Sequence, residues 1–307
     1  MGSILSHIEE NPQDTQRLIG LGYPELQQLI QNAERLHNEK QSVIELQKTR
    51  IISGGGGRKS IMSVQEQIIL TLVYLRHMTT FQLLGIQFGV SESTANSTFN
   101  YWLPLLRELL PSSLLEQVKK NDSDYEIVKE ILTEYELTVD SYEQVRERPG
   151  DNKEQEEYYS GNKSNHTFKT QVIIMPDGRD FVDVVAGVPG PKHDITLFRE
   201  NRDSFDQEQK FKGDLGYKGE ELISTPIKKP KLRELSPDQK EENKLFSAKR
   251  VFVEHRIRSI KIFRVAQERF RLNPKKYEQV ILTICGLVRL RIKALILPLE
   301  VYTIPLE

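Results

Sequence analysis

The stretch HTFKTQVIIMPDGRDFVDVVAGV, residues 166–188, contains two runs rich in β-branched and aromatic residues on either side of Pro176-Asp177-Gly178. Such runs favour extended strands, and a short Pro/Gly turn between them is typical of a β-hairpin. The middle of the chain is therefore predicted to contain an antiparallel pair of strands.

The segments around this hairpin alternate between strand and helix signals. ILTEYELTVD (131–140) is predicted to form one strand ahead of it, and a short helix is predicted to begin at Leu197. FKGDLGYKGE (211–220) is predicted to be a loop, and 227–244 a charged insertion. A long helix is expected from about 242 to 270, where Asn273-Pro274 stops it, followed by a largely buried last helix at 277–297. Residues 131–295 are thus expected to form one mixed α/β domain.

The first 120 residues have helical rather than strand periodicity. Residues 1–53 are expected to form a helical segment that could mediate self-association or pack on the next segment. Four consecutive glycines then predict a linker at 54–62. Residues 63–120 are expected to form a second helical unit, in which Ser63 and Glu66 have the spacing of a capping box.

Composition limits the class of protein. The chain has 307 residues, 37% hydrophobic and 28% charged, with a mean hydropathy of −0.49. No window approaches the 18 or so apolar residues of a membrane span. The single cysteine, Cys285, excludes a disulfide framework or a cysteine metal site. We expect a cytoplasmic protein with no membrane partner.

The net charge of −1 hides a strong segregation of charge along the chain. Residues 121–160 carry 13 acids against 4 Lys/Arg, whereas residues 245–293 carry 13 Lys/Arg against 3 acids. A basic segment of this kind is either a solvated helix face or a surface that binds nucleic-acid phosphates. An acid within it, Glu254, favours the second interpretation.

Residues 81–100 fit a helix-turn-helix. Leu84 suits the core of the first helix, Gly85 the crossing of the two helices, and Gly89 the left-handed turn between them. The alternative to a DNA-binding motif is a packed helical pair with a polar exposed face. Because serine and asparagine can bind base edges and phosphates, the cap and outward face of the second helix are the DNA-binding candidates: Ser91, Ser93, Asn96, Ser97 and Asn100.

Three acidic residues have settings unlike the ordinary charged surface. Asp140 is predicted to end its strand, Asp194 follows the turn Pro189-Gly190-Pro191, and Glu254 lies on a predicted helix face with Arg258 and Lys261. Carboxylates from distant elements are the ligands that Mg²⁺ or Mn²⁺ prefers, and a pair of such ions can catalyse phosphodiester chemistry. Asp140, Asp194 and Glu254 are therefore the candidate catalytic and metal-binding residues, with Arg258 and Lys261 as phosphate contacts.

The ordered motifs resemble the DDE-type transposases of bacterial insertion elements related to the Harbinger group. The resemblance covers about residues 63–293 and rests on LRHMTTFQLLGIQFGVSESTANSTFNYWLPLL, VDSYEQVRERP, YYSGNKSNHTFKTQVIIMPDGR, VPGPKHDITLFRE, GDLGYKGE and VEHRIRSIKIFRVAQERFR. It implies an α/β fold, with a ribonuclease-H-like catalytic domain behind an all-helical helix-turn-helix segment. The family's two aspartates and glutamate map to Asp140, Asp194 and Glu254.

The resemblance also implies a reaction and its partners. Two Mg²⁺ or Mn²⁺ ions would support cleavage of double-stranded DNA at the element's ends and transfer of the freed strand into target DNA, by a homo-oligomer assembled on the DNA. Where the family usually reads Asp-Gly-Thr-Glu, this chain has Asp140-Ser141-Tyr142-Glu143. Two alternatives remain open: a domesticated DNA-binding regulator with an inactive catalytic domain, and a plain metal-dependent nuclease.

Overall fold

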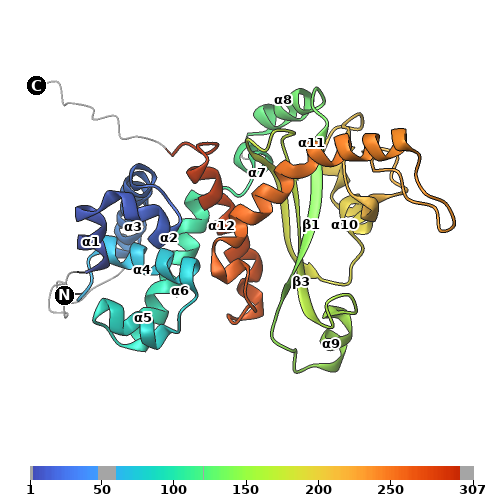
Figure 1. The fold of residues 1–307 in the computed structure, drawn as a ribbon. Coiled ribbons are helices and arrows are strands. Elements are labelled where there is room, and N and C mark those ends of the chain that lie inside the picture. The colour runs from blue at the N-terminus through green and yellow to red at the C-terminus, as the bar shows by residue number, and fades with distance from the viewer. Residues whose placement is uncertain (1–2, 48–59, 120, 298–307) are drawn as a thin grey trace, which may run out of the picture.

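The computed structural model describes residues 3–47, 60–119 and 121–297. A helical N-terminal part lies beside a mixed sheet, and the C-terminal helix α12 (Tyr277–Arg291) stands between them (Figure 1). The helical part consists of α1 (Ile4–Glu10), η1 (Pro12–Asp14), α2 (Thr15–Ile19), α3 (Tyr23–Gln47), α4 (Val64–His77), α5 (Phe81–Phe88) and α6 (Glu92–Leu109). Positions 54–59 of the predicted glycine linker lie outside the described residues.

The predicted N-terminal helices are confirmed. The apolar positions of α3 at Leu26, Leu29, Ile30 and Ala33 are buried, as their spacing indicated. Ser63 and Glu66 form both hydrogen bonds of a capping box at the start of α4. Of the described residues, no helix is long and apolar enough to cross a membrane.

The helix-turn-helix of α5 and α6 is also confirmed. Gly89 ends α5 with φ = 65°, a conformation that glycine adopts without a Cβ penalty. Ser91 caps α6 by accepting a hydrogen bond from the Thr94 amide. A Cβ on Gly85 would lie 2.7 Å from the Val90 carbonyl oxygen, so the close crossing of the two helices requires glycine here.

The sheet is organised around β3 (Asn165–Ile174). Antiparallel β1 (Leu137–Val145) and β4 (Phe181–Pro189) flank it, and the predicted hairpin between β3 and β4 is confirmed. On its other edge β1 pairs in parallel with β5 (Phe211–Lys212), which pairs in parallel with β6 (Ile223–Ser224). The short β2 (Tyr159–Ser160) pairs with the start of β3. This mixed sheet, with three antiparallel strands followed by two parallel ones, is the ribonuclease-H-like α/β fold.

The strand predicted at 131–140 was wrong in its bounds. Asn121 caps α8 (Asp122–Leu132), with two aspartates in its first turn, and the helix continues until Leu132 packs into the core. The strand therefore begins only at Leu137 and runs on to Val145, because β3 pairs with it over that length. Asp140 consequently lies inside β1 and does not end it.

Two other predictions were wrong in their limits. The long helix α11 (Pro237–Lys261) begins earlier than position 242, because Ser236 and Gln239 form a capping box and Pro237 fits the first helical position. It ends at Lys261, since Phe263 and Val265 turn into the core. Within the predicted loop 211–220, residues Phe211–Lys212 form a strand, because the edge of β1 offers them hydrogen bonds.

The remaining elements are short helices between those already described. They are α7 (Leu114–Val118), α9 (Asn152–Tyr158), α10 (Asp194–Glu200), η2 (Arg202–Ser204), η3 (Leu215–Tyr217), η4 (Arg264–Ala266) and η5 (Pro274–Lys276). One apolar cluster extends from α1 through α6 and α12 to β3 and β4. Arg289 of α12 is 0% exposed and donates to both oxygens of Asp180, at 2.7 and 2.8 Å, and to the carbonyls of Pro111 and Ser113. The helix-turn-helix and the sheet are thus packed on one shared core.

Candidate active site and DNA-binding surface

The candidate site is centred where the parallel pairing of β1 with β5 ends. The parallel register ends with Thr138 paired to Lys212. Two residues further along the chain from each stand Asp140, inside β1, and Asp214, just beyond the end of β5. The carboxyl ends of parallel strands are where α/β sheets usually present functional groups. The structure therefore adds Asp214, which was not among the predicted site residues, as a neighbour of Asp140.

Asp140 is held in an unfavourable environment for a charge. Its side chain is 18% exposed, and burial raises the pKa of the carboxyl to about 6. The Arg250 guanidinium, 3.5 Å away, and the Ser141 amide oppose this shift in pKa, whereas Asp214 and Asp194 add to it. A buried, like-charged carboxylate of this kind is typical of functional sites.

This pKa predicts a pH-dependent gain in stability for Asp140→Asn in metal-free protein. Because the folded pKa lies above the ordinary value of 3.8, the wild-type protein loses stability as the pH rises from about 4 through about 6. The asparagine variant lacks this loss and should be more stable at pH 8 by on the order of 3 kcal/mol. Urea unfolding at pH 3.5 and pH 8 measures the difference, and an equal effect at both values would contradict the assignment.

Asp194 begins α10 and faces the same centre. A Cβ on Gly216 would lie 2.9 Å from Asp214 Oδ1 and 3.1 Å from Asp194 Oδ2, so these two oxygens are no more than 6.0 Å apart, the sum of the two distances. The other oxygen, Asp194 Oδ1, lies 2.8 Å from Nζ of Lys169, whose side chain is 8% exposed. That approach lacks hydrogen-bond geometry, and Oδ1 remains a buried oxygen without a hydrogen-bond donor.

Glu254 lies on α11, which crosses the sheet over β1 (Figure 1). Arg250 reaches Asp140 from one end of this helix face, and Lys261 stands over the Tyr142 ring, 4.8 Å from its centroid, at the other end. Glu254 is four residues from Arg250 and seven from Lys261, so it shares their face and lies between them. It is exposed in this position, as is Arg258.

Lysines converge beside the acids. A cavity of 310 Å³ is lined by Lys163, Lys169 and Lys261 together with Ser141, Tyr142, Glu143, Asn162 and Asp194. Burial lowers the pKa of Lys261, and the nearby Lys163 lowers it further. Three cations from the turn before β3, from β3 itself and from the end of α11 thus share one cavity with Asp194. Such an arrangement suits the phosphates of a nucleic-acid backbone.

The departure from the family pattern at Ser141 and Tyr142 is accommodated within β1. The Ser141 hydroxyl lies 2.8 Å from the Tyr217 hydroxyl, to which Gln171 also donates. Gln171 in turn donates to the backbone carbonyl of Asp194, at 3.2 Å. Ser141 therefore joins a hydrogen-bond network that connects β1, β3, η3 and the start of α10. Glu143 accepts a hydrogen bond from Thr167 at 2.6 Å, which fits a role in stabilising the strand pair.

The donor set agrees in kind with a divalent cation. Asp140 and Asp194 are carboxylates that face cationic side chains, and one buried oxygen of Asp194 has no hydrogen-bond donor. Hard cations prefer such oxygen ligands. Within the described ranges, no three His, Cys, Asp or Glu side chains are grouped closely enough to hold a metal ion. The structure thus places Asp194 and Asp214 near Asp140 without forming a closed set of metal ligands, and Glu254 lies on the helix over β1.

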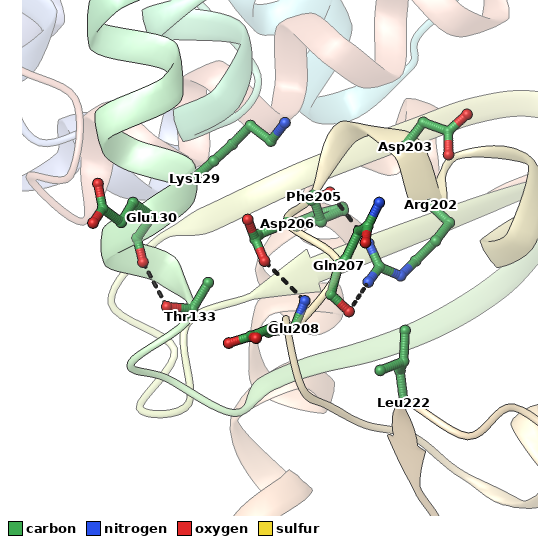
Figure 2. Close-up of a pocket in the computed structure, with 10 residues that line it drawn as sticks. All are labelled: Lys129, Glu130, Thr133, Arg202, Asp203, Phe205, Asp206, Gln207, Glu208 and Leu222. Atoms are coloured by element: carbon green, nitrogen blue, oxygen red, sulfur yellow. Dashed lines mark hydrogen bonds between the residues drawn. The ribbon is translucent and has the colours of Figure 1, made fainter.

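A larger cavity, of 960 Å³, lies elsewhere and has a different character. Figure 2 shows its lining from α8, η2 and the chain that leads to β5. Four acids, Glu130, Asp203, Asp206 and Glu208, outnumber the cations Lys129 and Arg202. Because this balance repels phosphates, the smaller lysine-lined cavity is the better candidate for binding DNA.

The predicted DNA-binding residues of α6 lie on its accessible side. Ser91, Ser93 and Ser97 are exposed, and Asn96 and Asn100 are half-buried. Asn100 donates to Asn96 at 2.7 Å, while the Ser91 hydroxyl lies within hydrogen-bond distance of Ser93 and Thr94. This face is therefore polar and accessible, and its asparagines are oriented by their contacts with each other.

Comparisons with known proteins agree with this geometry. The family described as "DDE superfamily endonuclease" matches residues 139–289, and "Helix-turn-helix of DDE superfamily endonuclease" matches residues 60–112. A curated protein of Microchaete diplosiphon, "Probable transposase for insertion sequence element IS702", is 30% identical over 225 residues, which are 72% of this chain and 78% of that protein. The chain belongs to the DDE-type insertion-element transposases. The predicted family and its helix-turn-helix are confirmed.

A solved structure, "Crystal structure of a pre-cleavage Mos1 transpososome", matches 75% of this chain and 86% of that chain. It is 13% identical, with a TM-score of 0.18.

Sequence reasoning missed several residues of the site in this family member. Asp214 lies in GDLGYKGE, one of the motifs that carried the resemblance, and it directly follows the short run Phe211–Lys212 that forms β5. That strand signal could have identified Asp214 as a second strand-end acid. Lys163, Lys169 and Arg250 had no such local signal, because only the packing of β3 and α11 brings them to the acids.

Proposed function

We propose that this protein binds the DNA ends of its insertion element, cleaves them in a metal-dependent reaction and transfers the cut strand to target DNA. The observation that supports the proposal is the proximity of Asp194 and Asp214 to the buried Asp140, with Asp194 lining a lysine-rich cavity, on a chain with a helix-turn-helix.

The acids would hold the metal. Asp194 and Asp214 lie near Asp140, and Glu254 on α11 is the fourth proposed ligand. Bound Mg²⁺ or Mn²⁺, in a pair of ions, would activate a water molecule and stabilise the leaving oxygen of the phosphodiester. Arg250 and Lys169 now neutralise Asp140 and Asp194, and these two side chains would be free to contact phosphate when a cation takes their place.

The chain's own cations would position the DNA. Lys163, Lys169 and Lys261 line the cavity beside Asp194, and Arg258 extends the basic face of α11. Hydrolysis would break the bond between phosphorus and the 3′ oxygen, leaving a 3′-hydroxyl and a 5′-phosphate. In strand transfer that 3′-hydroxyl would attack a target phosphodiester and release a target 3′-hydroxyl. Because one site acts on one end, two ends require at least two copies, and we propose a homo-oligomer on DNA.

The test uses duplex DNA taken from the two flanks of the gene, incubated with the full-length protein and Mg²⁺. We expect strands cut at the element boundary with 3′-hydroxyl ends, and joined products when target plasmid is added. Cleavage without joined products would identify a plain nuclease. Sequence-specific binding without cleavage in either Mg²⁺ or Mn²⁺ would identify a DNA-binding regulator and contradict the proposal.

A further inference from the structure

The helix-turn-helix region lacks the cations that DNA binding needs. Residues 60–112 contain two Arg/Lys, Arg76 and Arg107, against three glutamates. One of these glutamates, Glu92, begins the second helix of the motif. Contacts from Lys and Arg to phosphates supply most of the affinity of DNA-binding proteins and fix their position on the duplex.

Both arginines of this region are engaged within the protein. Arg76 donates to the carbonyl of Ile262, and burial lowers the pKa of its guanidinium. Arg107 pairs with Glu116 and donates to the carbonyl of Leu110. Neither is therefore placed to neutralise a phosphate, so the cations for this face must come from another part of the chain.

The segment that leads into α12 brings cations to this face. RLNPKK, residues 271–276, contains Arg271, Lys275 and Lys276 and no acid. Nζ of Lys276 contacts Oδ1 of Asn100, on the polar face of α6, and α12 packs along the same helix. Asn273 caps the turn by accepting from the Lys275 amide at 3.0 Å, which fixes the course of the segment.

Arg271 lies on the same side. Its charge acts on the hydroxyl of Tyr74, and the Tyr74 ring stacks on Phe81 at 4.5 Å and packs on Phe99 at 4.6 Å. Those two phenylalanines belong to α5 and α6. Arg271 and Lys275 are exposed, and Lys276 is half-buried against α6. The segment thus runs beside the helix-turn-helix, with Lys276 in contact with α6 and Arg271 near Tyr74 of α4.

We propose that residues 271–276 and the polar face of α6 form one composite DNA-binding surface. The α6 face, with Ser93, Asn96 and Ser97, enters the groove. Arg271 and Lys275 bind the phosphates along its edge, and Lys276 holds the segment against α6 through Asn100. The catalytic half of the chain thereby supplies the electrostatic part of end binding. The inference rests on DNA binding by the helix-turn-helix and is independent of the proposed cleavage chemistry.

The test is the salt dependence of binding, measured by fluorescence anisotropy without divalent metal, so that cleavage plays no part. On a duplex of about 30 base pairs, Lys275→Gln and Arg271→Gln are each expected to reduce the slope of log affinity against log salt by about 0.9. For the double variant, a fourfold rise in salt should then weaken binding about twelvefold less than for the wild-type protein. Lys210→Gln is the control, because Lys210 is an exposed lysine beside Glu208 and Glu221.

A hydroxyl-radical footprint locates the contact on DNA from the gene's flanks. Protection lost in the double variant should border the groove in which Ser97→Glu removes protection. Unchanged slopes, or the same reduction in Lys210→Gln, would overturn the proposal. Loss of protection at a site remote from the one affected by Ser97→Glu would also overturn it. Because Arg271 and Lys275 are exposed, the variants should melt at the wild-type temperature, which separates a lost contact from a lost fold.

Discussion

Asp140→Asn is expected to reduce strand cleavage by at least about a thousandfold, which corresponds to about 4 kcal/mol of transition-state stabilisation. The carboxylate sits at the centre of the site, between Arg250 and the acids Asp194 and Asp214. Asparagine keeps the size of the side chain but removes the negative charge that a divalent cation needs. Cleavage of labelled end DNA in Mg²⁺ measures the loss, and the affinity for the same DNA in metal-free buffer should be unchanged.

Asp183 provides the matched control. It lies on β4, and burial likewise raises the pKa of its carboxyl to about 6, with Lys119 and Glu116 as its charged neighbours in place of the site acids. Asp183→Asn therefore removes a comparable buried charge without touching the site. We expect it to leave cleavage at the wild-type rate. Wild-type cleavage by Asp140→Asn, or an equal loss in Asp183→Asn, would show that Asp140 has no special part in the reaction.

Asp214→Asn is expected to lose as much cleavage as Asp140→Asn, again about a thousandfold. The short parallel pairing of β1 and β5 ends two residues before each aspartate and brings Asp214 near Asp140. The sequence alone favoured Asp194, which faces Asp214 across Gly216 and is neutralised by Lys169. We expect Asp194→Asn to lose cleavage as well, because its carboxylate lies near those of Asp140 and Asp214.

The comparison between these two variants assigns the ligands. We would measure single-turnover cleavage in Mg²⁺ for Asp194→Asn and Asp214→Asn. DNA binding in metal-free buffer is the control for folding. If Asp194→Asn retains cleavage while Asp214→Asn loses it, the catalytic set becomes Asp140, Asp214 and Glu254. If Asp214→Asn retains cleavage, the strand-end argument fails and the set predicted from the sequence stands.

Much of the fold could be predicted because its signals are local. Ser63 and Glu66 cap α4, Gly89 turns the chain between α5 and α6, and Pro176-Asp177-Gly178 turns it between β3 and β4. Each signal acts over a few residues and survives in any packing. The first and last residues of a helix or strand were less predictable where a neighbouring element in the fold decided them. The start of β1 depended on how far α8 extended, and β5 exists only because β1 offers it an edge.

The candidate site likewise contains residues that local sequence indicated and residues that only the packing brought in. The sequence indicated Asp140, Asp194 and Glu254 from their neighbours in the chain, and its ordered motifs carried the family. It could not show that Asp214 stands beside Asp140, because two residues of parallel pairing between distant segments decide that. Nor could it show that Lys169 and Arg250 neutralise the acids, since β3 and α11 bring those cations from elsewhere.

By itself, then, the sequence determined the capped helices, the hairpin, the helix-turn-helix and the presence of candidate acids, all of which depend on interactions between residues close in the chain. Only the tertiary structure decided which charges meet. It placed Asp194 in one cavity with three lysines and brought Asp214 near Asp140. It also placed Arg271, Lys275 and Lys276 beside a helix that begins 179 residues before Arg271. The reason is physical: charges act through space, and the distances between them are set by the packing of the shared core around α12.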